Sequence, residues 1–355
     1  MFIKFKPSTS NWAGWRGVWN AVRTCATAEA GSTPTKPTYV SDWIVVDNTV
    51  AGGWTANYDT TSTSSSSTGL VGSMYCDTPK TSIDGGRQMH FDLYRSSTSS
   101  YGGVYFRSGM RTSSQTSGTQ YRNLTQSTGA GTNNYAYYWQ RYNGSPHSCE
   151  WIVCAQAGHV WVAKEEGSIR KIVGMSKLSE GAEFDYTAGS LHFPVGGLYT
   201  GGTTTTSFTY ESYAINAFGI QNQDESYGKR FNQLINWSYP INVNNNSSVT
   251  SNYVWPVAGS HTNTYNASPY NGTNAYLKST FDSQGFDRNS VNDVVFLNPL
   301  AGWNPRSLSG IKLLGWNREL STADLRSLHG QIMEAGGKKY MIWEQGKILW
   351  GLQLN

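Results

Sequence analysis

Ionised side chains are scarce in this sequence of 355 residues. Asp, Glu, Lys and Arg make up only 14% of it, against roughly 25% in an average soluble domain. The formal net charge is +4, and the basic residues occur as scattered pairs such as Arg170-Lys171 and Lys338-Lys339. Proteins that bind nucleic acid usually carry a basic patch or stripe that neutralises phosphates. The charge pattern therefore argues against nucleic-acid binding.

Long apolar runs are also missing. No segment approaches the roughly 18 consecutive apolar residues of a membrane-spanning helix. Residues 1–7 contain Lys4 and Lys6 but no continuous apolar run ahead of Pro7, which is unlike a signal peptide. We therefore expect synthesis in the cytoplasm of a cell, no association with a membrane, and release by a route such as lysis if the protein works outside a cell.

Cysteines are few, and familiar catalytic motifs are absent. Cys25, Cys76, Cys149 and Cys154 lack the paired CxxC spacing of a zinc site, so we expect free, buried thiols. The sequence has no GxxxxGK[ST] phosphate-binding loop, no GxGxxG after a strand, no HExxH and no GxSxG. We therefore expect no catalytic residues, no cofactor, no metal ion and no enzymatic activity.

Two polar pairs are the remaining candidates for catalysis. Glu183 and Asp185 would project from one strand face, as in some jelly-roll glycosidases, but Thr187 stands where a third acid would be needed. His90 and Asp92 alternate with apolar neighbours and should share the outer face of a strand, without a nucleophile at a defined spacing. We interpret His90 and Asp92 as a polar pair on the protein surface.

Aromatic side chains are abundant instead. The chain contains 14 Trp and 22 Tyr, more than two ordinary cores require, and such rings are favoured in interfaces between proteins. Many rings combined with few charges predict an obligate assembly of subunits. The alternative is a tightly packed monomer with a polar, hydroxyl-rich surface.

A helix is predicted from Asn11 to Ala30. Trp12, Trp15 and Trp19 recur there at i, i+3 and i+7, which places the three rings on one stripe. Burial of this stripe would remove on the order of 600 Å² from water, worth up to about 15 kcal/mol before entropy is subtracted. The stripe either docks against the first sheet of its own chain or clamps a neighbouring subunit. We take Trp12, Trp15 and Trp19 as candidate interface anchors.

The remaining chain alternates short β-type runs with loops rich in Gly, Ser, Thr and Asn. Strands are expected at residues 43–46, 89–94, 103–106, 135–139, 150–154, 159–163, 207–217, 253–255, 293–297 and 311–316. Two segments suggest where the domains meet: a linker at residues 31–37, and a Gly- and Thr-rich seam between domains at residues 196–206. We predict a mainly β protein with an N-terminal strand and amphipathic helix (1–34) and two β-sandwich or jelly-roll-like domains (35–190 and 191–355).

The second domain is expected to contain a short helix before a closing hairpin. Ser321 and Asp324 form a near capping box, and apolar residues up to Ile332 follow with helical spacing. Gly336-Gly337 is expected to end this helix in the left-handed conformation. The apolar runs on either side of residues 344–347 then predict the hairpin.

Residues 311–328 contain the segment IKLLGWNRELS, followed by Ala323-Asp324-Leu325 and Leu328. This segment resembles the closing strand and helix of concanavalin-like and laminin-G-like jelly rolls, in which an Asn-Arg-x-Leu-Ser turn precedes a short helix. The resemblance implies a carbohydrate-binding module whose exposed Trp or Tyr rings stack on sugars.

A second resemblance extends over the chain. The chain resembles structural proteins of tailed-bacteriophage virions in four places. These are the Trp-rich N-terminal helix, the turn at residues 51–55, residues 306–311 at the start of the strand 311–316, and the terminal hairpin at residues 339–354. In those proteins, β domains follow one another along a chain that ends in a Tyr-x-x-Trp hairpin. The resemblance implies a tail, baseplate, fibre or head-surface protein that holds its place in a symmetric assembly.

We therefore predict a non-enzymatic structural protein of a tailed-phage virion, in the tail, baseplate or tail-fibre region. It is expected to be homo-oligomeric and to have copies of itself and other virion proteins as partners. The alternative is a carbohydrate-binding jelly-roll module for host attachment, with a host-surface glycan as its partner.

Overall fold

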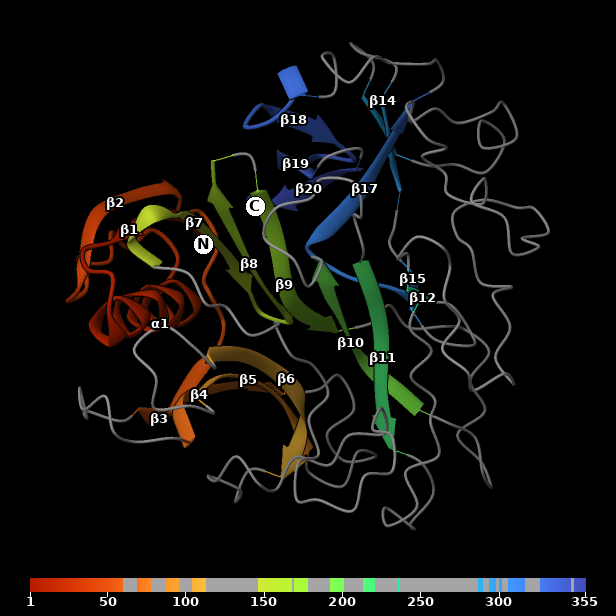
Figure 1. The fold of residues 1–355 in the computed structure, drawn as a ribbon. Coiled ribbons are helices and arrows are strands. Elements are labelled where there is room, and N and C mark those ends of the chain that lie inside the picture. Colours follow the sequence, from red (N-terminus) through yellow and green to blue (C-terminus); the bar gives the residue numbers. More distant parts are fainter. Residues whose placement is uncertain are drawn as a thin grey trace.

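A computed structural model describes much of the chain. The described residues are 1–59, 69–77, 87–95, 104–112, 146–167, 169–177, 192–200, 213–220, 235–236, 287–289, 294–297, 300–301, 306–316, 326–345 and 348–355. They form sheets of antiparallel strands together with one long helix, α1 (Trp12–Thr27) (Figure 1). The predicted class, mainly β with an N-terminal amphipathic helix, is thereby confirmed.

An eight-stranded sheet lies at the centre of the molecule, in the order β12-β11-β10-β9-β8-β7-β1-β2. Its strands are β1 (Phe2–Pro7), β2 (Val40–Asp47), β7 (Glu150–Gln156), β8 (His159–Glu166), β9 (Ile169–Lys177), β10 (His192–Thr200), β11 (Tyr213–Ile220) and β12 (Ile235–Asn236). The opening strand β1 pairs with β2 on one side and with β7 on the other. A segment near the N-terminus thus joins strands that are far apart in the sequence.

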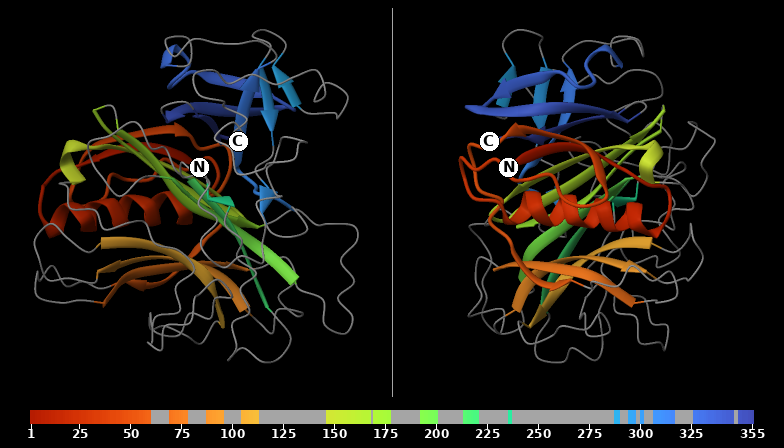
Figure 2. Two further views of the ribbon diagram at one scale, coloured as in Figure 1. Left: turned by 45° about the vertical axis from the view of Figure 1, so that its right-hand side comes forward. Right: turned by 90° about the vertical axis from the view of Figure 1, so that its left-hand side faces the viewer.

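Helix α1 lies between this sheet and a four-stranded sheet of β3 (Thr55–Asp59), β4 (Gly69–Asp77), β5 (Arg87–Arg95) and β6 (Val104–Thr112). A six-stranded sheet packs on the opposite face of the eight-stranded sheet (Figure 2). It has the order β13-β14-β17-β20-β19-β18. The molecule is therefore layered as sheet, helix, sheet and sheet.

The six-stranded sheet consists of β13 (Asp287–Asn289), β14 (Val294–Leu297), β17 (Ile311–Trp316), β18 (Ile332–Ala335), β19 (Lys338–Gln345) and β20 (Ile348–Gln353). The small elements β15 (Leu300–Ala301), β16 (Arg306–Ser307) and the 3₁₀ turn η1 (Pro146–Ser148) complete the described fold. The closing hairpin expected around residues 344–347 is confirmed as β19 and β20.

The predicted C-terminal helix is wrong for its second half. Of residues 326–335, only Arg326 and Ser327 are helical, and Ile332–Ala335 form the strand β18. Gly336 and Gly337 do adopt positive φ, 58° and 72°, but they form the two-residue turn between β18 and β19, a geometry that requires positive φ at both positions. The pairing of residues 332–335 with β19 stabilises a strand more than the helical spacing of the apolar residues favours a helix. Residues 317–325 lie outside the described residues.

The seam expected at residues 196–206 overlaps strand β10 at its start. Gly196 and Gly197 lie inside β10 and pair with both β9 and β11. Residues 201–206 lie outside the described part of the chain, as do the expected strands at 135–139 and 253–255 and the acidic pair Glu183 and Asp185.

Candidate functional site

The three tryptophans proposed as interface anchors lie on α1. The helix begins where the Asn11 side chain accepts a hydrogen bond from the Ala13 N–H, 2.9 Å away. Trp12, Trp15 and Trp19 are only 5%, 3% and 0% exposed. Of the two interpretations, docking against the sheets of the same chain is therefore the one observed. In this chain, none of the three rings is available to a neighbouring subunit.

The rings contact both sheets that enclose α1. Trp15 meets Trp151 of β7 edge to face, with ring centroids 5.8 Å apart. The Arg95 guanidinium of β5 lies 4.5 Å from the centre of the Trp12 ring, and burial lowers the pKa of Arg95. Trp19 packs directly on Gly72 of β4. The tryptophan stripe thus joins the eight-stranded and four-stranded sheets through one core.

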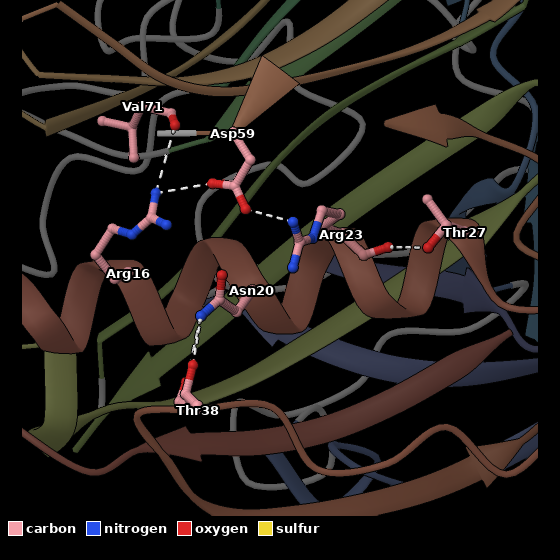
Figure 3. Close-up of polar contacts among 7 residues, drawn as sticks. All are labelled: Arg16, Asn20, Arg23, Thr27, Thr38, Asp59 and Val71. Carbon is pink, nitrogen blue, oxygen red and sulfur yellow. Dashed lines mark hydrogen bonds and ion pairs between the residues drawn. The ribbon is translucent and has the colours of Figure 1, made fainter. Parts of the chain in front are cut away.

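The polar side chains of α1 make a second connection to the four-stranded sheet (Figure 3). Arg16 donates to Asp59 Oδ1 at 2.9 Å and to the Val71 carbonyl at 3.4 Å. Arg23 pairs with the other carboxylate oxygen of Asp59. The side chains of Arg16 and Asp59 are only 7% and 24% exposed. Because loss of one member of a buried ion pair leaves an uncompensated charge, this contact fixes the orientation of the helix.

A polar cluster, which we call the sheet junction, joins the eight-stranded and six-stranded sheets. It consists of Glu165 on β8, Arg170 on β9, His329 ahead of β18 and Glu344 on β19. Arg170 donates from Nε to Glu165 Oε1 at 2.8 Å and pairs through Nη1 with Glu344. The Glu344 N–H donates to His329 Nδ1 at 3.0 Å, so His329 carries its proton on Nε2, which lies 3.2 Å from Glu165 Oε2.

The two carboxylates of the sheet junction differ in their electrostatics. Burial raises the pKa of Glu344, and Arg170 and His329 only partly offset this effect. Burial also acts to raise the pKa of Glu165, but hydrogen bonds from His329 and Arg170 outweigh it and leave the pKa below its ordinary value. Glu165 is thus the firmly ionised partner of Arg170. Each of these contacts bridges structural elements, which indicates a structural role for the cluster.

Further hydrogen bonds run across the same interface. Trp161 Nε1 of β8 donates to the Ser309 carbonyl at 2.9 Å, and the Ser309 N–H donates to Ser176 Oγ at 2.9 Å. Cys154 Sγ of β7 donates to the Gln353 carbonyl at 2.6 Å. These bonds attach the six-stranded sheet along β7, β8 and β9, so the two sheets are held over a broad contact.

Cys154 and His159 form a thiol–imidazole pair, with Sγ and Nε2 3.8 Å apart. Burial raises the pKa of Cys154 to about 12 and lowers that of His159 to about 3. At neutral pH the sulfur is therefore a thiol and the imidazole is neutral. A nucleophilic cysteine needs a thiolate, so this pair is structural. All four cysteines are buried thiols outside any disulfide, as the sequence predicts.

His90 and Asp92 are buried, so their interpretation as a surface pair is wrong. They share one face of β5, as the alternation predicts, but each is 0% exposed, and so is Ser73 on β4. Ser73 Oγ lies 3.3 Å from His90 Nδ1. Serine, histidine and aspartate thus lie close together in the interior, without solvent access. The chain covers both faces of this strand, which the local pattern does not reveal.

The sequence did not predict the sheet junction. Its members are separated by up to 179 positions, from Glu165 to Glu344, and share no motif spacing. The only local signal is the presence of charged residues at the ends of strongly apolar strand runs. Among the described residues, no group of three His, Cys, Asp or Glu side chains is placed to hold a metal ion.

In the same part of the chain, no helix has the length and apolar character needed to cross a membrane. No protein-family model matches this chain, and no curated protein is significantly similar to it.

Proposed function

We propose that the protein is a non-enzymatic structural component of a tailed-phage virion, in its tail, baseplate or fibre region. It would act by packing against copies of itself and against other virion proteins. In this proposal, two β-sandwich domains (35–190 and 191–355) provide the packing surfaces. The resemblance of the N-terminal helix and the C-terminal hairpin to such virion proteins supports this proposal.

One structural observation carries the proposal: the buried charged clusters are used to join layers. Asp59 connects α1 to the four-stranded sheet through Arg16 and Arg23, and Arg170 connects two sheets through Glu165 and Glu344. Such cross-links favour a rigid body, and rigid subunits suit a symmetric assembly because little conformational entropy is lost when they associate.

The burial of the tryptophan stripe limits which surfaces can be used. Subunit contacts would have to use side chains that stay exposed after folding. The large apolar examples among the described residues are Tyr39, Ile44, Tyr58 and Ile332, of which Ile44 and Ile332 are the most exposed at 58% and 52%.

Peptide mass spectrometry of purified phage particles tests the proposal. The protein should remain with intact particles through density-gradient purification, at a constant copy number related to the particle symmetry. Its absence from particles, with recovery only in the soluble fraction of the lysate, would overturn the proposal.

The alternative is a carbohydrate-binding module for host attachment. Tyr39 and Tyr58 favour it, because both are 38% exposed and exposed rings can stack on sugars. The resemblance of residues 311–328 to jelly-roll lectins points the same way. Glycan-array binding by the folded chain, weakened by Tyr58→Ala but not by Tyr39→Ala or the reverse, would support this function. The absence of binding to any glycan would exclude it.

A further inference from the structure

Strand β2 is the last strand of the central sheet on one side. It pairs with β1, and no other strand of the described chain pairs with it. Figure 1 shows β2 at the rim of the molecule. The edge of a sheet is a template for strands of other chains, and proteins therefore block or cover it. The surroundings of β2 decide whether another chain can extend the central sheet.

The segment of residues 31–37, which we call the edge strap, runs antiparallel to β2 on the side away from β1. Its first two residues are held at Asn48, directly after the strand. The Gly31 N–H donates to the Asn48 carbonyl at 2.7 Å, and Asn48 Nδ2 donates to the Ser32 carbonyl at 2.8 Å. The start of the edge strap is thereby attached to the end of β2.

Two further hydrogen bonds hold the rest of the edge strap. The Trp43 indole donates to the Pro34 carbonyl at 2.9 Å, while its ring packs against the core that contains α1. Lys36 Nζ donates to the Ser41 carbonyl at 3.2 Å. The edge strap is therefore attached near both ends of β2 and in the middle, and it covers the outer side of the strand.

The edge strap covers β2 without becoming a strand of the sheet. Of the four hydrogen bonds, only the one from Gly31 to Asn48 joins two backbone groups, and the others use side chains. Pro34 and Pro37 have no N–H to donate. Proline and lysine are residues that proteins place on sheet edges to prevent pairing, and Lys36 lies between the two prolines. The outer side of the edge strap is thus a poor template for another strand.

The turn between the edge strap and β2 contains a strained residue. Tyr39 has a φ of 63°, which is uncommon for any residue except glycine and persists only where the surroundings hold it. The Tyr39 carbonyl accepts from the Ser8 N–H at 2.8 Å. It also lies against Gly17 of α1, where a Cβ would come within 2.2 Å of it. Contacts with β1 and α1 therefore hold the turn that directs the edge strap along β2.

We propose that the edge strap is an autoinhibitory contact, which prevents copies of this chain from pairing with one another through β2. With the strap in place, an approaching strand meets prolines and side chains instead of a row of backbone donors and acceptors. With the strap released, β2 becomes an ordinary sheet edge, and every copy of the chain offers the same one. The strap acts in the isolated chain, so the inference does not depend on the virion role.

Loosening the edge strap in the full-length protein tests the proposal. Trp43→Phe keeps a ring against the core but removes the N–H that binds the Pro34 carbonyl, and Asn48→Ala removes the side-chain bond to Ser32. The double variant should associate at a protein concentration roughly tenfold lower than the wild type, or lower still, because two hydrogen bonds that hold the strap are lost. Analytical ultracentrifugation over a concentration series measures this shift.

Trp54→Phe is the matched control. It also removes an indole N–H, but this group donates to the carbonyls of Gln156 and His159 instead of to the edge strap. The control should associate like the wild type even where thermal unfolding shows a similar loss of stability. Equal association of the control and the double variant would attribute the effect to general destabilisation and would overturn the proposal.

Hydrogen exchange locates the contact between copies. In the dilute double variant, the backbone amides of β2 should exchange faster than in the wild type, and they should become protected again as the concentration rises. Protection at other strands alone would overturn the proposal, as would a folded double variant that associates no more than the wild type. If the double variant does not fold, Asn48→Ala alone provides the same comparison with a smaller shift.

Discussion

The approach of α1 to the four-stranded sheet depends on Gly72 of β4. A Cβ on Gly72 would lie 2.0 Å from Trp19 Nε1 and 2.1 Å from Trp19 Cε2, distances that no pair of non-bonded atoms tolerates. Trp19 is fully buried and has little room to move. The absence of a side chain at position 72 therefore permits the helix to approach the four-stranded sheet.

We predict that Gly72→Ala lowers the free energy of unfolding by about 1–3 kcal/mol, the usual cost of overpacking a core. Urea unfolding followed by tryptophan fluorescence measures the loss. Trp19→Phe provides the control, because the smaller ring leaves space for the new methyl group. In that background, Gly72→Ala should cost clearly less. An equal cost in both backgrounds would mean that the collision with Trp19 is not the cause.

Glu165 should make stability depend on pH. Its pKa is lower in the folded protein than its ordinary value near 4.3, so the unfolded chain binds more protons in this range. Its contribution is fully present above the pKa of the unfolded chain and is lost as the pH falls through the folded pKa. Glu165→Gln should therefore be less stable than the wild type at pH 7.

The difference between wild type and Glu165→Gln should shrink as the pH falls below about 4. Urea unfolding at a series of pH values between 7 and 3 checks this. A difference in unfolding free energy that stays constant over that series would show that the charge of Glu165 is not what stabilises the sheet junction.

Helix α1 is the element whose start is most clearly encoded. Asn11 accepts a hydrogen bond from the Ala13 N–H, and asparagine is among the best residues at this capping position. Asn11→Ala should therefore reduce stability by about 1 kcal/mol. Asn11→Asp keeps an acceptor oxygen and should recover most of the loss, as measured by thermal or urea unfolding. If the aspartate variant is as unstable as the alanine variant, the cap is not responsible.

Strand β18 shows how an element can override its local pattern. Ile332 and Glu334 are exposed, whereas Met333 and Ala335 are buried, the two-residue period of a strand with one covered face. Ile332 also fits helical spacing when it is considered with Leu325 and Leu328. The edge of β19, together with glycines suited to a tight turn, resolves this ambiguity in favour of the strand.

The stacking of layers is the main feature of the whole molecule, and the sheet junction is its clearest polar link. Arg170→Ala would leave Glu344, which is 2% exposed, without its cationic partner. Loss of one partner from a buried ion pair typically costs about 3–5 kcal/mol, and we expect a loss of this size in urea unfolding.

Glu344→Gln removes the carboxylate that Arg170→Ala leaves unpaired. The double variant should therefore be more stable than the sum of the two single losses implies. Simple additivity would indicate that Arg170 and Glu344 do not interact through their charges.

Much of the fold was predictable because it depends on neighbours in the sequence. The spacing of Trp12, Trp15 and Trp19 predicted the helix, and short apolar runs predicted strands at residues 150–154 and 159–163, which the structure contains as β7 and β8. Strand alternation also placed His90 and Asp92 on one face. Periodicity, capping and turn chemistry act over a few residues, so a linear sequence displays them directly.

Contacts between distant segments were not predictable in this way. Alternation shows that His90 and Asp92 share a face but not that this face is covered, and a tryptophan stripe shows that a helix must be buried but not what buries it. The pairing of β1 with β7 and the meeting of Arg170 with Glu344 both depend on which segments come together in space. Those choices follow from the summed packing energy of the complete chain, which no short stretch of sequence contains.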